Sequence, residues 1–172
     1  LQTHEIARLG VGIKTQIPSL FENLSVRENL WLSARKNNGK LGADAIADEV
    51  LERIGLKEFR DTPVIRLAHG QWQWVELGVV IAGKPKLVLL DEPAAGMTGW
   101  ERERTAELIK EINKDCAIIV VEHDMQFIRM IAKKVTVFNR GEILLEDSIE
   151  RVLDDQRVKD VYLGKQAGGV TL

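Results

Sequence analysis

Two adjacent carboxylates follow an apolar run near the middle of the sequence. The run Leu87 to Leu90 leads directly into Asp91, Glu92 and Pro93. Neighbouring carboxylates repel each other, so a buried strand that ends in such a pair usually serves a cation or a reaction. Asp91 suits Mg²⁺ coordination, directly or through water, and Glu92 suits polarising a water molecule for attack on a phosphate. The alternative is a strand that simply ends in an acidic surface turn.

A second apolar run ends in a histidine. Ile118 to Val121 is followed by Glu122, His123 and Asp124. A histidine there can donate a hydrogen bond to a phosphate oxygen, although it could equally cap the next helix. If both runs are strands of one parallel sheet, their carboxyl ends lie side by side, where ligands bind in open α/β sheets. This coincidence favours one shared site.

The third candidate is residues 67–71, Leu-Ala-His-Gly-Gln, at the start of a predicted helix. The free backbone N–H groups and the dipole of a helix start favour an anion. Ala68 and Gly70 are small enough for a phosphate to approach, and His69 and Gln71 add side-chain donors. The alternative is an ordinary helix start.

The elements around these residues alternate in type. The apolar pattern predicts helices over 71–82, 101–112 and 125–132, and strands over 87–90, 117–121 and 135–138. Such alternation predicts an α/β fold with a parallel sheet covered by helices on both faces. A turn at 139–141 then predicts a hairpin with residues 142–145, and two short helices are expected over 149–153 and 158–163.

The first third of the chain is predicted to be mainly helical. Residues 8–14 read as a strand, and a loop follows that contains Gln16. Ser25 and Glu28 form a capping-box pattern that starts one helix, which should stop at 37–39 (Asn-Asn-Gly). A second helix is predicted over 43–54. We therefore expect four segments: 1–24, a helical subdomain at 25–66, an α/β core at 67–147, and a helical tail at 148–172.

Composition limits the classes of protein that the chain can belong to. The 172 residues are 45% hydrophobic, with 24 basic and 26 acidic residues and a net charge of −2. This balance gives no electrostatic argument for a nucleic-acid partner. The single Cys116 is expected in the core, and the longest apolar runs are about five residues, too short to cross a bilayer. Because the chain starts with Leu1, we expect it to be a piece of a longer protein.

In this order the segments resemble the nucleotide-binding domain of ABC transporters. The matching positions are Gln16 (Q-loop), 67–71 (the LSGGQ signature), 86–93 (Walker B strand with its catalytic Glu), 94–98 (D-loop) and His123 (switch histidine). We call 67–71 the signature segment and 94–98 the D-loop segment. Residues 5–10, 18–24 and 161–164 are similar to the branched-chain amino acid and urea importers. His69 with 95–98 and 122–125 looks most like the urea-importer ATPase.

The resemblance implies an ATPase that uses ATP and Mg²⁺ on a P-loop NTPase-like core. It makes Glu92 and His123 catalytic, and assigns Asp91 and Gln16 to the metal. It also implies that residues 68–71 and Thr98 contact the nucleotide of a second ATPase subunit, in a homodimer or heterodimer. The pair would dock on permease subunits at the cytoplasmic face of a bacterial membrane. Two alternatives remain: a soluble ABC protein outside transport, and a non-catalytic ABC-like fragment.

A P-loop is the part of the pattern that we do not find. The nearest match, Gly78 to Pro85, lies at a helix end, has an apolar interior and carries Pro85 where a hydroxyl residue is needed. The resemblance places the P-loop strand region before Leu1. We therefore expect the chain alone neither to bind ATP tightly nor to hydrolyse it, and to expose a sheet edge or face that forms a non-native dimer. Ala68 and Thr98 replace the usual Ser and Asp and should weaken contacts between subunits.

Overall fold

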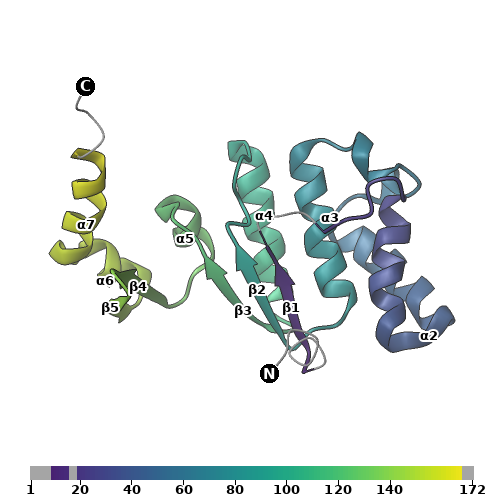
Figure 1. Cartoon of the computed structure of the whole chain (residues 1–172), viewed down its shortest axis with the longest axis horizontal. Coiled ribbons are helices and arrows are strands. Elements are labelled where there is room, and N and C mark those ends of the chain that lie inside the picture. The colour runs from purple at the N-terminus through teal and green to yellow at the C-terminus, as the bar shows by residue number, and fades with distance from the viewer. Residues whose placement is uncertain (1–8, 16–18, 168–172) are drawn as a thin grey trace. The chain divides into compact units, whose positions relative to one another are not determined.

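The computed structural model describes residues 9–15 and 19–167, and the chain divides into two compact units (Figure 1). Unit 1 ends at His123 and unit 2 begins at Asp124. No helix among the described residues is both long and apolar enough to cross a membrane. The candidate residues of the sequence analysis all lie in unit 1, which is therefore the unit that positions the site.

The sheet of unit 1 is parallel, as predicted. It consists of β1 (Val11–Lys14), β2 (Leu87–Asp91) and β3 (Ala117–Val121), in that spatial order (Figure 1). The register aligns Ile13 with Leu89 and Leu89 with Ile119. Because β2 is the central strand, its carboxyl end lies beside that of β3, as the sequence analysis expected.

The two faces of this sheet differ. Side chains alternate between faces along a strand, and on one face Lys14, Val88 and Leu90 are buried. On the other face the side chains of Ile13, Ile119 and Val121 are 45%, 55% and 63% exposed. Within the described residues of unit 1 no helix covers this apolar face, so the prediction of helices on both faces is not met in that unit.

Helix α3 (His69–Ala82) packs on the covered face. A Cβ added at Gly12 of β1 would lie only 2.7 Å from a methyl carbon of Val80, so glycine lets the strand and the helix approach closely. Helix α4 (Gly99–Ile112) is joined to α3 by a buried hydrogen bond from Trp74 Nε1 to Thr105 Oγ1 of 2.9 Å. These contacts hold the helices that carry the signature and D-loop segments.

Helix α2 (Val26–Arg53) corrects the prediction of two helices separated at 37–39. Its capping box at Ser25 and Glu28 is present as predicted, but the helix runs without a break for 28 residues. Asn and Gly are poor helix formers that cost about 1 kcal/mol or less each. Starting a new helix costs a fresh nucleation step, so one continuous helix is favoured. The 3₁₀ turns Lys57–Phe59 and Val64–Arg66 lead from α2 to α3.

The described residues of unit 2 form a hairpin and three helices. These are α5 (Met125–Ile131), β4 (Val135–Asn139), β5 (Glu142–Asp147), α6 (Ile149–Asp154) and α7 (Gln156–Ala167). The prediction that 135–138 joins the parallel sheet is wrong among the described residues, since β4 pairs antiparallel with β5. Arg140 and Gly141 both have positive φ, at 50° and 85°, which is the two-residue turn that folds neighbouring strands into a hairpin.

Candidate active site

The carboxyl ends of β2 and β3 meet at the candidate site. Asp91, the last residue of β2, is paired in register with Val121, the last residue of β3. The next backbone amide, that of Glu92, donates to the Val121 carbonyl oxygen at 2.9 Å. Glu92 has φ of 43°, in the left-handed region that residues with a side chain rarely adopt. The chain therefore turns sharply at the second carboxylate.

Glu92 and His123 are brought together at this edge. His123 Nδ1 lies 3.1 Å from Glu92 Oε1 and 3.4 Å from Glu122 Oε2. Carboxylate oxygens accept hydrogen bonds, so Nδ1 can donate to either of them when it carries a hydrogen. The His123 side chain is 76% exposed, whereas those of Glu92 and Glu122 are 31% and 3% exposed. The ring is thus held by two carboxylates and remains accessible from solvent.

Asp91 supplies the oxygen atoms that a magnesium ion would need. Mg²⁺ prefers oxygen ligands and usually keeps several waters or phosphate oxygens, so one strand-end carboxylate fits it. Within the described ranges no group of three His, Cys, Asp or Glu side chains is arranged to hold a metal. Such an ion would therefore take most of its ligands from phosphate and water. Gln16, the second predicted ligand, lies outside the described residues.

The signature segment places an uncapped helix start on the surface. Ala68 is the N-cap of α3 and has no side-chain acceptor, while Gln71 Oε1 accepts from the Ala68 amide at 3.1 Å. The first amides of α3 are therefore not occupied by the usual Ser or Thr cap. Gly70 is buried, and a Cβ there would overlap the Glu101 carboxylate. His69 contacts the D-loop segment, with Nε2 3.2 Å from the Ala95 carbonyl oxygen.

Thr98 caps helix α4. Its hydroxyl donates to Glu101 Oε2 at 2.8 Å, and the same oxygen accepts from the Thr98 amide at 2.8 Å. These bonds, led by the one from the amide, lower the pKa of Glu101. The threonine at this D-loop position therefore has a structural role within its own chain. The expectation that Ala68 and Thr98 weaken contacts between subunits stays a prediction.

Sequence reasoning missed a buried ion pair beside the site. Lys14 Nζ at the end of β1 lies 3.4 Å from Glu76 Oε2 of α3, and both side chains are almost fully buried. Burial raises the pKa of Glu76, and the charge of Lys14 partly opposes that shift. The Ser19 amide also donates to Glu76 at 3.3 Å. An acid among the apolar residues of α3 was a visible signal, but nothing in the sequence identified Lys14 as its partner.

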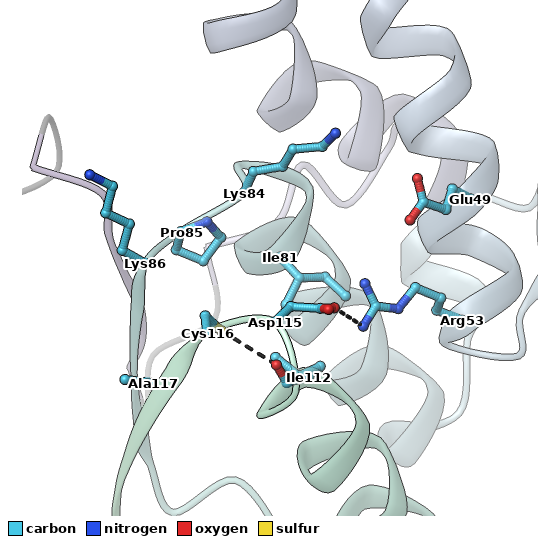
Figure 2. Close-up of a pocket in the computed structure, with 10 residues that line it drawn as sticks. All are labelled: Glu49, Arg53, Ile81, Lys84, Pro85, Lys86, Ile112, Asp115, Cys116 and Ala117. Atoms are coloured by element: carbon cyan, nitrogen blue, oxygen red, sulfur yellow. Dashed lines mark hydrogen bonds and ion pairs between the residues drawn. The ribbon is translucent and has the colours of Figure 1, made fainter.

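A separate cavity of about 630 Å³ lies away from this site (Figure 2). Its lining includes Lys86 and Ala117, at the amino ends of β2 and β3, whereas Asp91 lies at the carboxyl end of β2. Arg53 points across it to Asp115, with 2.8 Å between Nη2 and Oδ2 (Figure 2). The cavity and the carboxylate pair therefore occupy opposite ends of the strands.

Known proteins are similar to this chain in fold and in sequence. The cbiO1 protein of Clostridium perfringens, part of the ABC transporter complex cbiONQ, superposes with a TM-score of 0.80 at 25% identity, over 94% of this chain and 67% of that one. The lipopolysaccharide export ATP-binding protein LptB of Haemophilus influenzae is 30% identical, over 96% of this chain and 70% of its own length. For the branched-chain amino acid transport protein LivG of Escherichia coli K12 the figures are 32%, 96% and 72%.

The fold is that of an ATP-binding cassette, in which a parallel sheet and its helices match the solved structures. Residues 2–95 match the ABC transporter family directly. The chain belongs to this family and is an ABC-type ATPase component. The family assignment agrees with the resemblance seen in the sequence.

Proposed function

We propose that the chain is part of the ATP-hydrolysing subunit of a bacterial ABC importer for urea or branched-chain amino acids. The observation that carries the ATPase assignment is the contact of 3.1 Å between Glu92 and His123 at the carboxyl edge of the sheet. Asp91 ends the adjoining strand. In this proposal the three residues serve as general base, hydrogen-bond donor and metal ligand for phosphoanhydride hydrolysis.

Each group has a distinct role in this proposal. Glu92 orients and polarises the attacking water. His123 is held through Nδ1 and contacts the γ-phosphate from its exposed side. Asp91 and Gln16 serve Mg²⁺, which neutralises charge on the phosphates when bound. All of these groups therefore act at the γ-phosphate of ATP.

The signature segment acts on the nucleotide of a second ATPase subunit. The uncapped amides after Ala68 suit a phosphate brought by that subunit, whereas Gly70 is buried against the Glu101 carboxylate. Thr98 and the rest of the D-loop segment border the same face. Permease subunits in the membrane complete the assembly, with the ATPase pair on their cytoplasmic side. Dimerisation and permease binding are properties that family membership supports.

The transported solute rests on likeness alone. LivG supports a branched-chain amino acid, and the sequence around His69, 95–98 and 122–125 supports urea. LptB is a relative of similar identity that serves lipopolysaccharide export, so export is the competing function. Uptake of labelled urea and labelled leucine by cells that carry the wild-type protein or Glu92→Gln decides between them. Loss of urea or leucine uptake in the Glu92→Gln cells supports import. Uptake of both solutes at the wild-type level in those cells contradicts it.

We also propose that the 172-residue chain alone turns over ATP slowly or not at all, because its sequence contains no P-loop pattern. Mg²⁺-dependent ATP turnover should appear when a segment that carries a P-loop is joined ahead of Leu1. Efficient turnover by the purified 172-residue chain contradicts this proposal. If no form of the protein hydrolyses ATP, the non-catalytic alternative of the sequence analysis holds instead.

A further inference from the structure

His69 joins the signature segment to the D-loop segment. Its Nε2 lies 3.2 Å from the carbonyl oxygen of Ala95. A carbonyl oxygen only accepts, so Nε2 must carry the hydrogen and the bond selects this tautomer. His69 is the first residue of α3, whereas Ala95 comes three residues after Glu92. One side chain thus connects two segments that follow different elements of unit 1.

Ala95 is also bonded to the residue that we propose as the general base. Its amide donates to the Glu92 carbonyl oxygen at 3.2 Å, while its own carbonyl accepts from His69. Two consecutive hydrogen bonds therefore run from the start of α3 to the backbone of Glu92. Glu92 has positive φ, a conformation that persists only where neighbouring contacts hold it.

Gly96 allows the imidazole to lie against this turn. Its φ is 72°, and a Cβ built there would be 3.0 Å from His69 Nε2 and 3.5 Å from Cδ2. Any side chain at 96 would be strained by its backbone and would also press on the ring. The geometry of the turn and the position of His69 are therefore matched to each other.

A separate set of buried contacts holds Met97, at the other end of the contact between α3 and the D-loop segment. Trp74 Nε1 donates to Thr105 Oγ1 at 2.9 Å, and that hydroxyl lies 3.1 Å from Met97 Sδ of the D-loop segment. These atoms are buried, so α3, α4 and Met97 form a rigid base. Ala95 and Gly96, by contrast, lie at the exposed outer end, where His69 supplies the contact with α3.

We propose that His69 is a positioning residue that couples the signature segment to Glu92 through Ala95. The inference rests on the proposed function, in which the signature segment serves the nucleotide of the second subunit and Glu92 serves the chain's own. A phosphate that binds at the start of α3 would act on the residue next to His69. The hydrogen bonds through Ala95 would then transmit that event to the general base of the other site.

Hydrogen exchange of the Ala95 and Met97 amides tests the positioning. His69→Gln keeps an N–H donor at a similar reach, His69→Leu removes it, and Arg66→Leu is a matched control at an exposed residue outside the contact. We expect exchange to be about two- to twelvefold faster in His69→Leu, the range given by one neutral hydrogen bond. His69→Gln and Arg66→Leu should stay near wild type. Equal exchange in His69→Leu and wild type overturns the positioning role.

ATP turnover by a form of the subunit that carries a P-loop tests the coupling. His69→Leu should lower kcat by a similar two- to twelvefold with KM unchanged, and His69→Gln should restore it. Faster exchange with unchanged kcat overturns the coupling to Glu92. If the wild-type subunit shows no turnover, the proposed function has failed, and the exchange comparison alone decides whether His69 positions the D-loop segment.

Discussion

Glu92 and Glu122 both face Nδ1 of His123, and the two carboxylates differ in their surroundings. The Glu122 side chain is buried and also accepts the His123 amide at 2.9 Å, whereas Glu92 is partly open to solvent. Glu122 is therefore fixed and orients the ring. Glu92 keeps an oxygen accessible to a water molecule, so the two acids have separate roles in the proposed site.

Replacing the proposed base tests this division. Glu92→Gln keeps the size of the side chain but removes the proton acceptor, so ATP turnover should fall by about 10²- to 10⁴-fold. Nucleotide binding should persist. Steady-state phosphate release by the subunit that turns over ATP measures the effect. Glu103→Gln, on an exposed position of α4, is the control, and wild-type turnover in Glu92→Gln would exclude Glu92 as the base.

The buried pair of Lys14 and Glu76 makes a second residue-level prediction. Lys14→Met leaves the Glu76 carboxylate buried without its cation, which should lower the free energy of unfolding by about 3–5 kcal/mol. Urea denaturation measures this loss. The double variant Lys14→Met with Glu76→Leu removes both charges and should recover most of the stability. A double variant as unstable as the single one would show that the pair itself is stabilising.

Helices α2 and α3 both continue through residues with poor helix propensity. The Asn-Asn-Gly sequence at 37–39 predicts a helix end, yet α2 continues through it. In α3, Gly78 lies in the interior of a helix, where glycine is unfavourable on its own. Its neighbour explains it: a Cβ at 78 would lie 2.8 Å from Leu30 Cδ2 of α2. The two helices approach each other at a position where only glycine fits.

Two helical glycines form a matched test of this packing. Gly78→Ala should destabilise the protein by about 1–3 kcal/mol, because overpacking outweighs the gain in helix propensity. Gly99→Ala, at the first position of α4 with nothing within 4 Å of its added Cβ, should be neutral or stabilise by up to about 1 kcal/mol. Thermal unfolding compares them. Equal effects at both positions would contradict the packing explanation.

Local sequence patterns predicted most helices and strands, including the two strands whose carboxyl ends lie side by side. The strand Ala117–Val121 has its predicted bounds, and the capping box at Ser25 is present. Both depend on residues close together in sequence. The contacts of Lys14 with Glu76 and of His69 with Ala95 join distant segments, and their partners become visible only once the chain is folded. Sequence reasoning therefore predicted the strand ends that lie side by side, but it missed the contacts between distant segments.

The exposed apolar face of the sheet in unit 1 affects how whole molecules associate. Ile13, Ile119 and Val121 present an apolar surface across β1 and β3 of unit 1. Parallel sheets are normally covered on both faces, and an exposed apolar patch of this kind favours association. The non-native dimer expected from the sequence remains a prediction, and this face is its structural basis.

Light scattering tests that association. The 172-residue chain should show an average mass that rises with concentration, since two open faces can bury each other. Replacing Ile119 and Val121 together with Lys should shift the mass toward that of a monomer. Gly99→Ala is the control, because it is a small change in α4 that leaves the exposed sheet face unaltered. A monomeric mass for the wild-type chain at all concentrations would contradict the prediction.

Acid should destabilise both units. Hydrogen bonds from Arg27 lower the pKa of Asp48, and those from Arg157 lower the pKa of Asp155 to about 2. The ordinary value is about 3.9, so below it the unfolded chain binds more protons, and this stability is lost as pH falls toward 2. Glu76, with a raised pKa, acts in the opposite direction. Urea midpoints at pH 6, 4 and 3 should fall in that order.

Asp48→Asn isolates one of these contributions. The substituted side chain has no proton to gain, so the urea midpoint of unit 1 should depend less steeply on pH between 4 and 3 than in the wild-type chain. The stability at pH 6 should be lower, because the ion pair with Arg27 is gone. An unchanged acid slope would mean that other carboxylates dominate.

The left-handed backbone of Glu92 lowers the stability of the fold at the residue that we propose as the general base. A non-glycine residue in that conformation costs of order 1–3 kcal/mol. Glycine or asparagine at 92 would relieve this cost and yield a more stable protein without a general base. Selection of variants for thermal tolerance alone would therefore be expected to discard the carboxylate first, and selection for transport would restore it.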